Sequence, residues 1–324
     1  MSFNNSLITQ IYENMNNFII KTSLIFTLFF PLLVYSQQES RVYEEGSEVY
    51  LKVDEKWVKS LEKYDNTTSN ETYETLSLDT YKERFRLLDV NTNLNIDYND
   101  VTYSYVKKYL SYRWYHRIIG LSSYYFPLFE SALDKYGLPR EIKYLAVVES
   151  ALNPRAGSWA GAKGIWQFMP ATGKEFGLYD SKYYSGFYDP VRSSDAAARY
   201  LRDLYRKFGD WNLAISAYNC GAGNVNKAIR KAGTKSYWRV RQFLPKETQA
   251  YVPSFIAVNY IFNFYRLHNI KPMYFKYTFY DVKMITNNKP TSFKNISGDI
   301  AFLRFANPQF ISDYIPSNSI IYTK

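Results

Sequence analysis

Glu149 is the first residue of this sequence whose position suggests chemistry. Within the predicted helix 140–152, Ile142, Leu145 and Leu152 recur at helical spacing, and Glu149 falls on the same apolar stripe. Because a carboxylate is costly to ionise among apolar side chains, we expect a raised pKa for Glu149. Glycosidic-bond cleavage needs such a protonated acid near neutral pH, since the leaving oxygen must receive a proton. The position also fits a structural Glu that pairs with a buried Arg or caps a neighbouring helix.

The sequence offers little for other kinds of catalysis. Cys220 is the single cysteine, so one chain cannot form a disulfide or a cysteine-based metal site. His116 and His268 are the only histidines and lack metal-ligand spacing, which indicates structural or surface roles. Asp189 and Asp195 are typical of a turn and a helix start rather than of a second catalytic acid. We therefore expect no metal, no cofactor and no zinc-hydrolase chemistry.

Composition and charge add two broad constraints. The chain has 33 Tyr and 22 Phe, and aromatic rings both fill cores and pack against the apolar faces of sugars. Codon usage in an AT-rich genome explains the same excess more simply. The net charge of +10 favours a polyanionic partner such as an acidic cell wall or anionic lipid, but Lys and Arg form no long run. We expect a monomer that associates with the membrane or cell wall, and nucleic acid is not an expected partner.

The N-terminal residues are typical of a secretory signal peptide. Residues 18–35 are largely apolar with Lys21 near their start, and the charge-free core 24–34 is short for a bilayer span and contains Pro31. We expect a signal peptide over residues 1–36, with Met15 as an alternative start. It predicts secretion across the inner membrane to the periplasm or cell envelope. An uncleaved N-terminal anchor is the alternative.

The rest of the chain divides into a linker, a helical region and a tail. Residues 37–79 are polar and predict a linker, and residues 80–136 carry apolar side chains at helical spacing and predict an N-terminal helical extension. Residues 137–270 predict a helical catalytic domain. Within it, the glycines and prolines of 153–194 indicate loops that hold functional side chains on a rigid scaffold. Next along the chain, Ser193 and Ser194 are predicted to cap a helix.

The tail, residues 271–324, has a different pattern. Residues 274–285 are rich in alternating aromatic and β-branched side chains, which favours a strand. Residues 293–316 resemble a degenerate LysM-type glycan-binding module, in which a short helix precedes a helix ending near Asn307-Pro308. An extension that packs on the catalytic domain accounts for the same residues. The expected fold class is mainly α, with a small C-terminal α+β tail.

Four sequence blocks carry the strongest signal. They are ESALNP (149–154) followed by SWAGAKGIWQFMPATG (158–173), DAAARYL (195–201), AYNCGAG (217–223) and LPKETQAYVP (244–253). In this order they resemble the soluble lytic transglycosylase domain of family 1, most closely its membrane-bound murein transglycosylase D type. The resemblance covers about residues 80–270. It implies a goose-type, lysozyme-like helical catalytic domain that acts on the glycan strands of peptidoglycan.

The resemblance also implies roles for individual residues. Glu149 stands where the family has its catalytic acid/base. Core packing is the alternative for Met169 and Tyr218. Cys220 occupies a variable place in its block and is expected to be a small buried residue rather than a nucleophile. The substrate-binding residues implied are Ser158, Gln167, Met169, Tyr218, Asn219, Glu247 and Tyr251, while Gly161, Gly164, Gly221 and Gly223 are expected to serve turn geometry.

The implied reaction needs no second carboxylate. A two-carboxylate hydrolase places its second acid about 5–10 Å from the first, and none stands out in 153–194. In the family, the C6 hydroxyl of muramic acid attacks its own anomeric carbon, which cleaves the MurNAc-β-1,4-GlcNAc bond and leaves a 1,6-anhydro end. Glu149 would act first as acid and then as base. Three alternatives stay open: a goose-type lysozyme that hydrolyses the bond, a non-catalytic peptidoglycan-binding module and a structural envelope protein.

Overall fold

The computed structural model describes residues 54–65, 74 and 76–324, which belong to one compact unit. The predicted signal peptide, residues 1–36, lies outside the described residues, as does the first part of the predicted linker. Among the residues that are described, no helix combines the length and the apolar character needed to cross a membrane.

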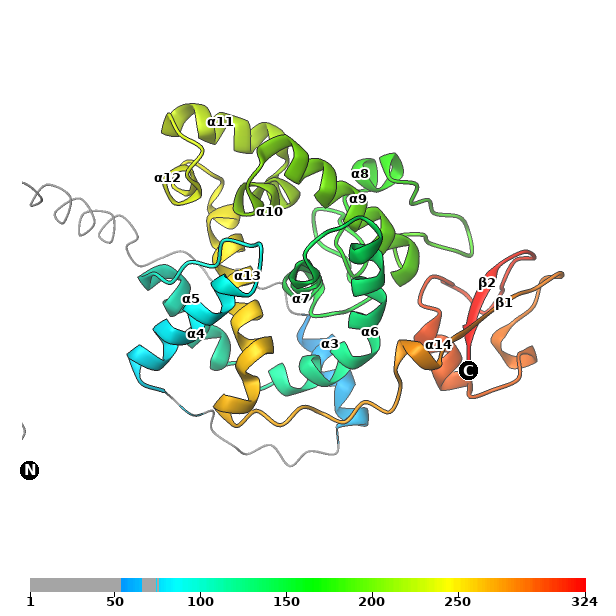
Figure 1. The fold of residues 1–324 in the computed structure, drawn as a ribbon. Helices are drawn as coiled ribbons and strands as arrows, with labels where there is room; N and C mark the ends of the chain where they lie inside the picture. Colours follow the sequence, from blue (N-terminus) through cyan, green and yellow to red (C-terminus); the bar gives the residue numbers. More distant parts are fainter. Residues whose placement is uncertain (1–53, 66–73, 75) are drawn as a thin grey trace, which may run out of the picture. The chain divides into compact units, whose positions relative to one another are not determined.

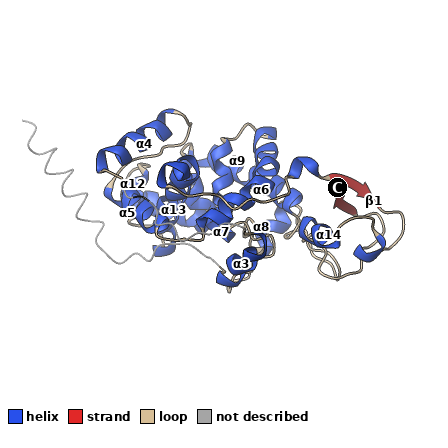
Figure 2. Cartoon of the chain, turned by 90° about the horizontal axis from the view of Figure 1, so that it is seen from below, coloured by secondary structure: helices blue, strands red, loops and turns tan. Residues whose placement is uncertain are grey.

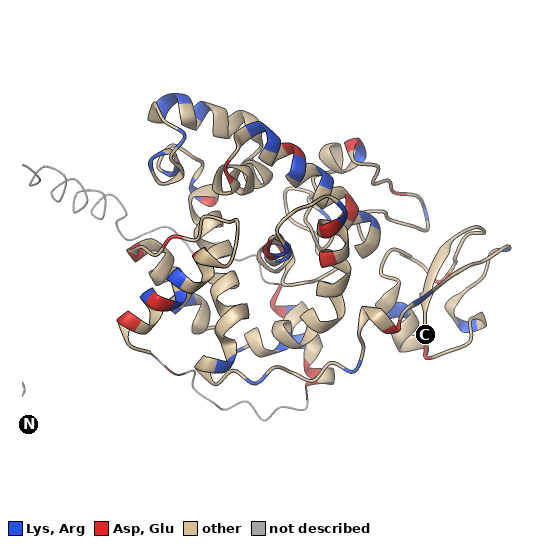
Figure 3. Cartoon of the chain, in the orientation of Figure 1, with Lys and Arg blue, Asp and Glu red and all other residues tan. Residues whose placement is uncertain are grey.

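Helices account for most of the described chain, so the predicted mainly α class is confirmed (Figure 1). Within the described residues, the only two paired strands belong to the tail, where Figure 2 shows them in red. Lys and Arg are distributed along many helices and are interspersed with Asp and Glu (Figure 3). The elements in chain order are α3 (Glu55–Ser60), η1 (Leu61–Tyr64), α4 (Leu78–Val90), α5 (Asp100–Leu110), α6 (Tyr115–Lys135), η2 (Arg140–Lys143), α7 (Tyr144–Ser150), α8 (Pro170–Glu175), α9 (Pro190–Phe208), α10 (Trp211–Cys220), α11 (Ala222–Ala232), α12 (Tyr237–Arg241), α13 (Lys246–Phe264), η3 (Tyr265–His268), η4 (Phe279–Asp281), β1 (Lys283–Thr286), η5 (Phe293–Asn295), α14 (Ile300–Ala306) and β2 (Ile320–Thr323).

Helix α13 is the central element of the fold. Every residue from Ala250 to Phe262 is buried, which is typical of a helix without a solvent face. The helix packs against α5, α7 and α10. Because neighbours hold it on several sides, α13 presents its side chains at fixed positions. Two of these, Thr248 and Tyr251, belong to the site described below.

A short helix lies inside the predicted linker. Residues 54–65 form α3 and η1, with Val58 and Leu61 buried in the fold. The buried carboxylate of Asp65 accepts hydrogen bonds from His116 (2.7 Å) and Arg117 (2.9 Å) of α6. For residues 54–65 the linker prediction is therefore wrong. Two buried apolar side chains and the ion pairs of Glu62 and Asp65 with Arg117 hold in place a segment whose overall composition is polar.

Four local predictions are also wrong in whole or in part. The predicted helix 140–152 is a 3₁₀ turn, η2, followed by the short helix α7. Ser193 and Ser194 lie inside α9, which begins at Pro190 and is capped by the carboxylate of Asp189. Gly223 has an ordinary helical position in α11 rather than a turn. Of the predicted strand 274–285, only its last residues belong to β1, which pairs with β2 in antiparallel register.

The tail packs on two loops of the catalytic region, one before and one after the glycine-rich block 158–173. Arg155 donates hydrogen bonds to the carbonyls of Pro308 (2.9 Å) and Phe310 (2.6 Å). The backbone N–H of Ser185 donates to the Gln309 carbonyl at 2.8 Å. These contacts support the alternative of an extension that packs on the catalytic domain.

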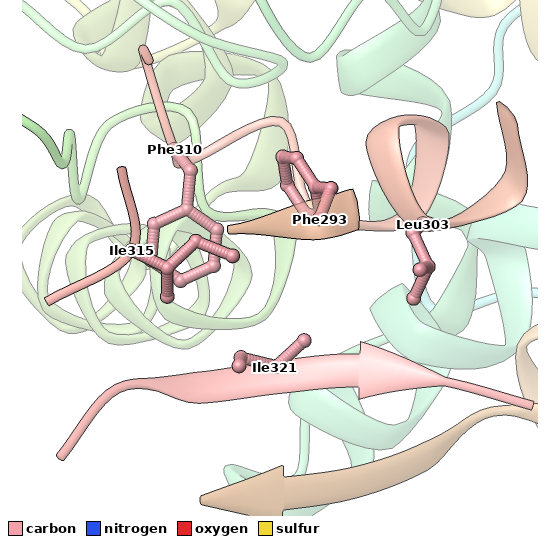
Figure 4. Close-up of a cluster of buried hydrophobic side chains, with 5 residues drawn as sticks. All are labelled: Phe293, Leu303, Phe310, Ile315 and Ile321. Carbon is pink, nitrogen blue, oxygen red and sulfur yellow. The ribbon is translucent and has the colours of Figure 1, made fainter. Parts of the chain in front are cut away.

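The tail has a small hydrophobic core of its own (Figure 4). Tyr184, from the loop of the catalytic region, packs against this cluster. Helix α14 ends at Ala306, directly before Asn307 and Pro308, as expected. The LysM-type resemblance stays a prediction. The cluster consists of Phe293, Leu303, Phe310, Ile315 and Ile321.

Candidate active site

Glu149 lies near the end of α7, a helix that is buried on all sides. Its side chain is 5% exposed, and every other residue of α7 is buried as well. The helix stops abruptly, because Ala151 (φ 49°) and Leu152 (φ 60°) both adopt the left-handed conformation. Two successive non-glycine residues of this kind are unusual, and such backbone is concentrated at functional sites. The predicted burial of Glu149 is confirmed, and its raised pKa stays a prediction.

One buried hydroxyl holds the Glu149 carboxyl group. Tyr251 of α13, which is fully buried, donates a hydrogen bond to Oε1 of Glu149. Helices α7 and α13 pack directly together, so this contact is fixed by the core. The sequence resemblance implied that Tyr251 binds substrate; in the fold its side chain lies behind the cavity lining and contacts Glu149 instead.

The surroundings of Glu149 form an open cavity of about 390 Å³. A cavity of this volume lies within the range of small-molecule sites. It joins residues from α7, the glycine-rich loops, α9, α10 and α13. The lining residues are Glu149, Ser158, Ala160, Ala162, Gln167, Phe168, Met169, Thr172, Tyr200, Tyr218, Asn219, Cys220, Gly221 and Glu247.

The glycine-rich loop is tied to α7 by the residue after Glu149. The Ser150 hydroxyl lies 2.8 Å from the Ile165 carbonyl and 3.0 Å from the Ala146 carbonyl. Gly164 has φ +83°, and a Cβ atom there would lie 2.0 Å from the Phe187 carbonyl oxygen. Only glycine fits such a position, both for its backbone angle and for this close approach. The prediction that Gly164 serves turn geometry is confirmed.

Ser158, Gln167 and Met169 all reach the cavity from this loop. Ser158 Oγ accepts a hydrogen bond from the Ala162 N–H at 2.9 Å. The Gln167 amide donates to the carbonyls of Gly164 (2.9 Å) and Ala156 (3.2 Å), so it also stabilises the loop. Met169 is 45% exposed, and the core-packing alternative for it is wrong.

Tyr218 and Asn219 reach the cavity from α10. The Tyr218 hydroxyl donates to the Trp166 carbonyl at 2.8 Å, which ties α10 to the backbone of the glycine-rich loop. Burial, and then the negative charge of Glu149, raise the pKa of Tyr218 well above its usual range. Asn219 Oδ1 accepts a hydrogen bond from the Thr248 hydroxyl of α13 at 2.7 Å. The end of α10 is thereby anchored beside Glu149.

Glu247 brings a second carboxylate to the cavity. It comes from the first turn of α13, far from the glycine-rich segment in which no partner acid was found. Glu247 is exposed, whereas Glu149 is buried. The site therefore combines one carboxyl group in apolar surroundings with one in contact with water. Such a pairing is what separates the acid and base roles of two carboxyl groups, so Glu247 bears directly on the choice between transfer and hydrolysis.

Several lining residues were not predicted from the sequence. Cys220 is half-buried and lines the cavity, so the expectation of a plain buried residue is wrong. Burial raises the pKa of its thiol. Tyr200 is another lining residue, and no sequence pattern distinguishes it from a core residue of its helix. Phe168 and Thr172 lie within the block 158–173, and their closeness in sequence to Met169 is the signal that could have identified them.

Metal-binding side chains do not gather at this site. Across the described residues, no group of three or more His, Cys, Asp and Glu side chains is arranged to hold an ion. His268 is buried and bonds through Nδ1 to the Glu74 carbonyl at 2.9 Å. His116 pairs with Asp65 (2.7 Å). Both histidines have structural roles, as predicted.

Fold and site together define a helical domain built around one buried carboxyl group in an open cavity. Comparison with known families is consistent with this class. Residues 127–240 match the family described as the transglycosylase SLT domain. The resemblance drawn from the four sequence blocks is confirmed.

Curated relatives match part of the chain. Membrane-bound lytic murein transglycosylase D of Escherichia coli (strain K12) is 38% identical over 172 residues, which cover 51% of this chain and 38% of that protein. Membrane-bound lytic murein transglycosylase C of Haemophilus influenzae (strain PittEE) is 31% identical over 157 residues, covering 42% and 43%. The chain therefore spans less than half the length of these two relatives.

Solved structures give a weaker likeness. The 70 kDa soluble lytic transglycosylase SLT70 from Escherichia coli is 25% identical, with a TM-score of 0.39, over 46% of this chain and 25% of that one.

Proposed function

We propose that this protein is a peptidoglycan lytic transglycosylase with Glu149 as its general acid and base. The observation that carries the proposal is the buried Glu149 carboxyl group, held by Tyr251 and facing a cavity of about 390 Å³. The match of residues 127–240 to the transglycosylase SLT domain supports the same reaction. The substrate is the MurNAc-β-1,4-GlcNAc bond of a glycan strand.

The reaction has two proton transfers at one carboxyl group. Glu149 first donates its proton to the leaving O4 as the bond to the anomeric carbon breaks. The carboxylate then accepts the proton of the muramic acid C6 hydroxyl as that oxygen bonds to the anomeric carbon. The products are a strand with a free O4 hydroxyl and a 1,6-anhydro end, and no water is consumed. Glu149 ends the cycle protonated again.

Several cavity residues would position the sugar for this attack. Met169 and Tyr200 offer apolar surface, and Ser158, Gln167 and Asn219 offer polar groups at the wall. A substrate that supplies its own nucleophile gains mainly from being held in the reactive geometry. No metal or cofactor takes part in this scheme.

The test is digestion of purified sacculi, followed by mass spectrometry of the products. The wild-type chain should release ends that lack one water relative to reducing sugars. Glu149→Gln should lower the rate by about 10²–10⁴-fold, the typical contribution of general acid–base catalysis. Full activity of Glu149→Gln would overturn the site assignment. If the wild-type chain and Glu149→Gln bind sacculi equally and the wild type releases no products, the protein is instead a non-catalytic binding module.

Hydrolysis by a goose-type lysozyme is the second candidate, and the presence of Glu247 in the cavity is the observation in its favour. Digestion in water enriched in heavy oxygen separates the two reactions. A hydrolase places the heavy atom at each new reducing end, whereas a transglycosylase does not. Glu247→Gln should abolish a hydrolase that uses this carboxylate and should leave the anhydro product of a transglycosylase intact.

We also propose that the protein acts in the bacterial envelope, where peptidoglycan lies. The predicted signal peptide over residues 1–36 supports secretion to the periplasm. Cell fractionation with an antibody against the chain tests this location. The chain is also predicted to be a monomer, which sedimentation of the purified chain would check. Its predicted association with the membrane or cell wall would be checked by sedimentation of envelope fractions.

A further inference from the structure

Trp159 is the tryptophan of this chain whose ring lies in solvent. All six tryptophans fall within the described residues, and the other five are buried or half-buried. Trp159 is 99% exposed. A fully exposed indole adds nothing to core packing, and its large apolar surface is unfavourable in water. The stability of the fold therefore gives no reason for this side chain.

The other indole rings have structural partners. Each is held inside the fold by a hydrogen bond from its ring nitrogen or by stacking on a tyrosine. Trp159 has neither, as far as the described part of the chain extends. The pairs are Trp57 with the Ala151 carbonyl (3.0 Å), Trp166 with Ser194 (2.9 Å), Trp238 with Asp97 (2.6 Å), Trp114 with Tyr115 (ring centroids 4.7 Å apart) and Trp211 with Tyr205 (4.2 Å).

The turn that carries Trp159 is part of the cavity wall. Its two neighbours, Ser158 and Ala160, both line the cavity. The Gly161 N–H donates to the Ser158 carbonyl at 3.0 Å, which closes a four-residue turn with Trp159 at its second position. Ser158 and Ala162 are joined by two further hydrogen bonds of 2.9 Å each. The indole thus projects into solvent from a well-braced base at the rim of the cavity.

The cavity is small for the substrate class of the proposed function. A volume of about 390 Å³ lies near the lower end of the range for small-molecule sites. A glycan strand continues on both sides of the bond that is cleaved, so its outer sugars must lie beyond the cavity. The faces of pyranose rings are apolar, and a flat aromatic surface at the rim complements them.

We propose that Trp159 is a stacking platform for a β-1,4-linked N-acetylhexosamine ring of the strand, outside the cavity that holds the cleaved bond. Trp159 is a positioning residue, because its ring does not reach the reacting atoms. Its effect is on affinity for long strands rather than on the chemical step. This inference depends on the proposed function for the identity of the ligand.

Calorimetric titration with the trimer and the hexamer of N-acetylglucosamine tests the platform. The full chain carries Glu149→Gln so that the sugars are not cleaved. Adding Trp159→Ala should raise the Kd of the hexamer about tenfold, equivalent to ~1.4 kcal/mol, and leave the Kd of the trimer unchanged. Trp159→Phe should recover most of the affinity. Tyr280→Ala removes another exposed aromatic ring, 81% exposed and outside the cavity lining, and should change neither Kd.

Kinetics of the otherwise wild-type chain give an independent readout. Trp159→Ala should raise KM on isolated glycan strands and leave kcat and the melting temperature unchanged. An unchanged hexamer Kd, or an equal loss for trimer and hexamer, overturns the platform. If the Glu149→Gln chain binds neither sugar nor sacculi, the glycan ligand is itself wrong, and both proposals fail. Binding by that chain with no effect of Trp159→Ala overturns the platform alone.

Discussion

The hydrogen bond from Tyr251 to Glu149 is the contact through which the fold acts most directly on the proposed chemistry. When Glu149 gives up its proton, the carboxylate that forms receives this hydrogen bond in a buried environment. The interaction is therefore stronger in the transition state than with the protonated acid, and only such differential interactions raise kcat. Tyr251→Phe removes the hydroxyl and keeps the ring that packs in α13.

The magnitude follows from the type of bond. A hydrogen bond to a charged group contributes about 1.5–3 kcal/mol, which corresponds to a loss of kcat of about 10- to 150-fold. KM should change little, because the sugar does not contact the buried hydroxyl. Loss of a donor to the charged form also favours the protonated acid, so the pH–rate profile should move to higher pH. Rates of anhydro-product release from sacculi at a series of pH values measure both effects.

Tyr260→Phe is the matched control. Tyr260 also lies on α13 and is fully buried, and its hydroxyl accepts a hydrogen bond from Arg84 at 3.2 Å. This substitution should cost comparable stability in thermal unfolding without lowering kcat. The reasoning is refuted if Tyr251→Phe keeps kcat within twofold of the wild type while Glu149→Gln abolishes activity, or if both phenylalanine variants lower kcat equally.

Two further predictions concern residues around the site. Trp57→Phe removes the hydrogen bond to the Ala151 carbonyl, which lies just beyond α7. The substitution should cost about 1 kcal/mol of stability in denaturant unfolding and should lower kcat with little change in KM. An unchanged kcat would mean that α3 only adds stability. Because burial raises the pKa of the Cys220 thiol, its thiolate forms only above the usual thiol range, so alkylation by iodoacetamide should be slow near pH 8 and accelerate as pH rises. Alkylation should block the cavity and activity, Cys220→Ser should be resistant, and rapid labelling at neutral pH without loss of activity would contradict the prediction.

Much of the helical part of this protein could be predicted from local pattern. Val101, Tyr105 and Tyr109 recur on one face of α5, and Asn99 with Thr102 forms the capping box that begins it. These signals lie within a few residues of one another, so periodicity and capping rules detect them. The same rules failed for residues 274–285 and for α3, because short elements depend on the surface against which they pack.

The sequence by itself singled out Glu149 as the candidate catalytic residue, together with the blocks around it. It did so through residue types at fixed spacing and through resemblance, since the apolar stripe alone could not separate catalysis from structure. In the fold the whole of α7 is buried, so the stripe marks no particular face. The tertiary structure decided what surrounds the carboxyl group. Tyr251 and Glu247 come from α13, roughly a hundred residues later, and only packing of α13 against α7 brings them to it. Contacts at such separation depend on the three-dimensional path of the chain, which no local spacing encodes.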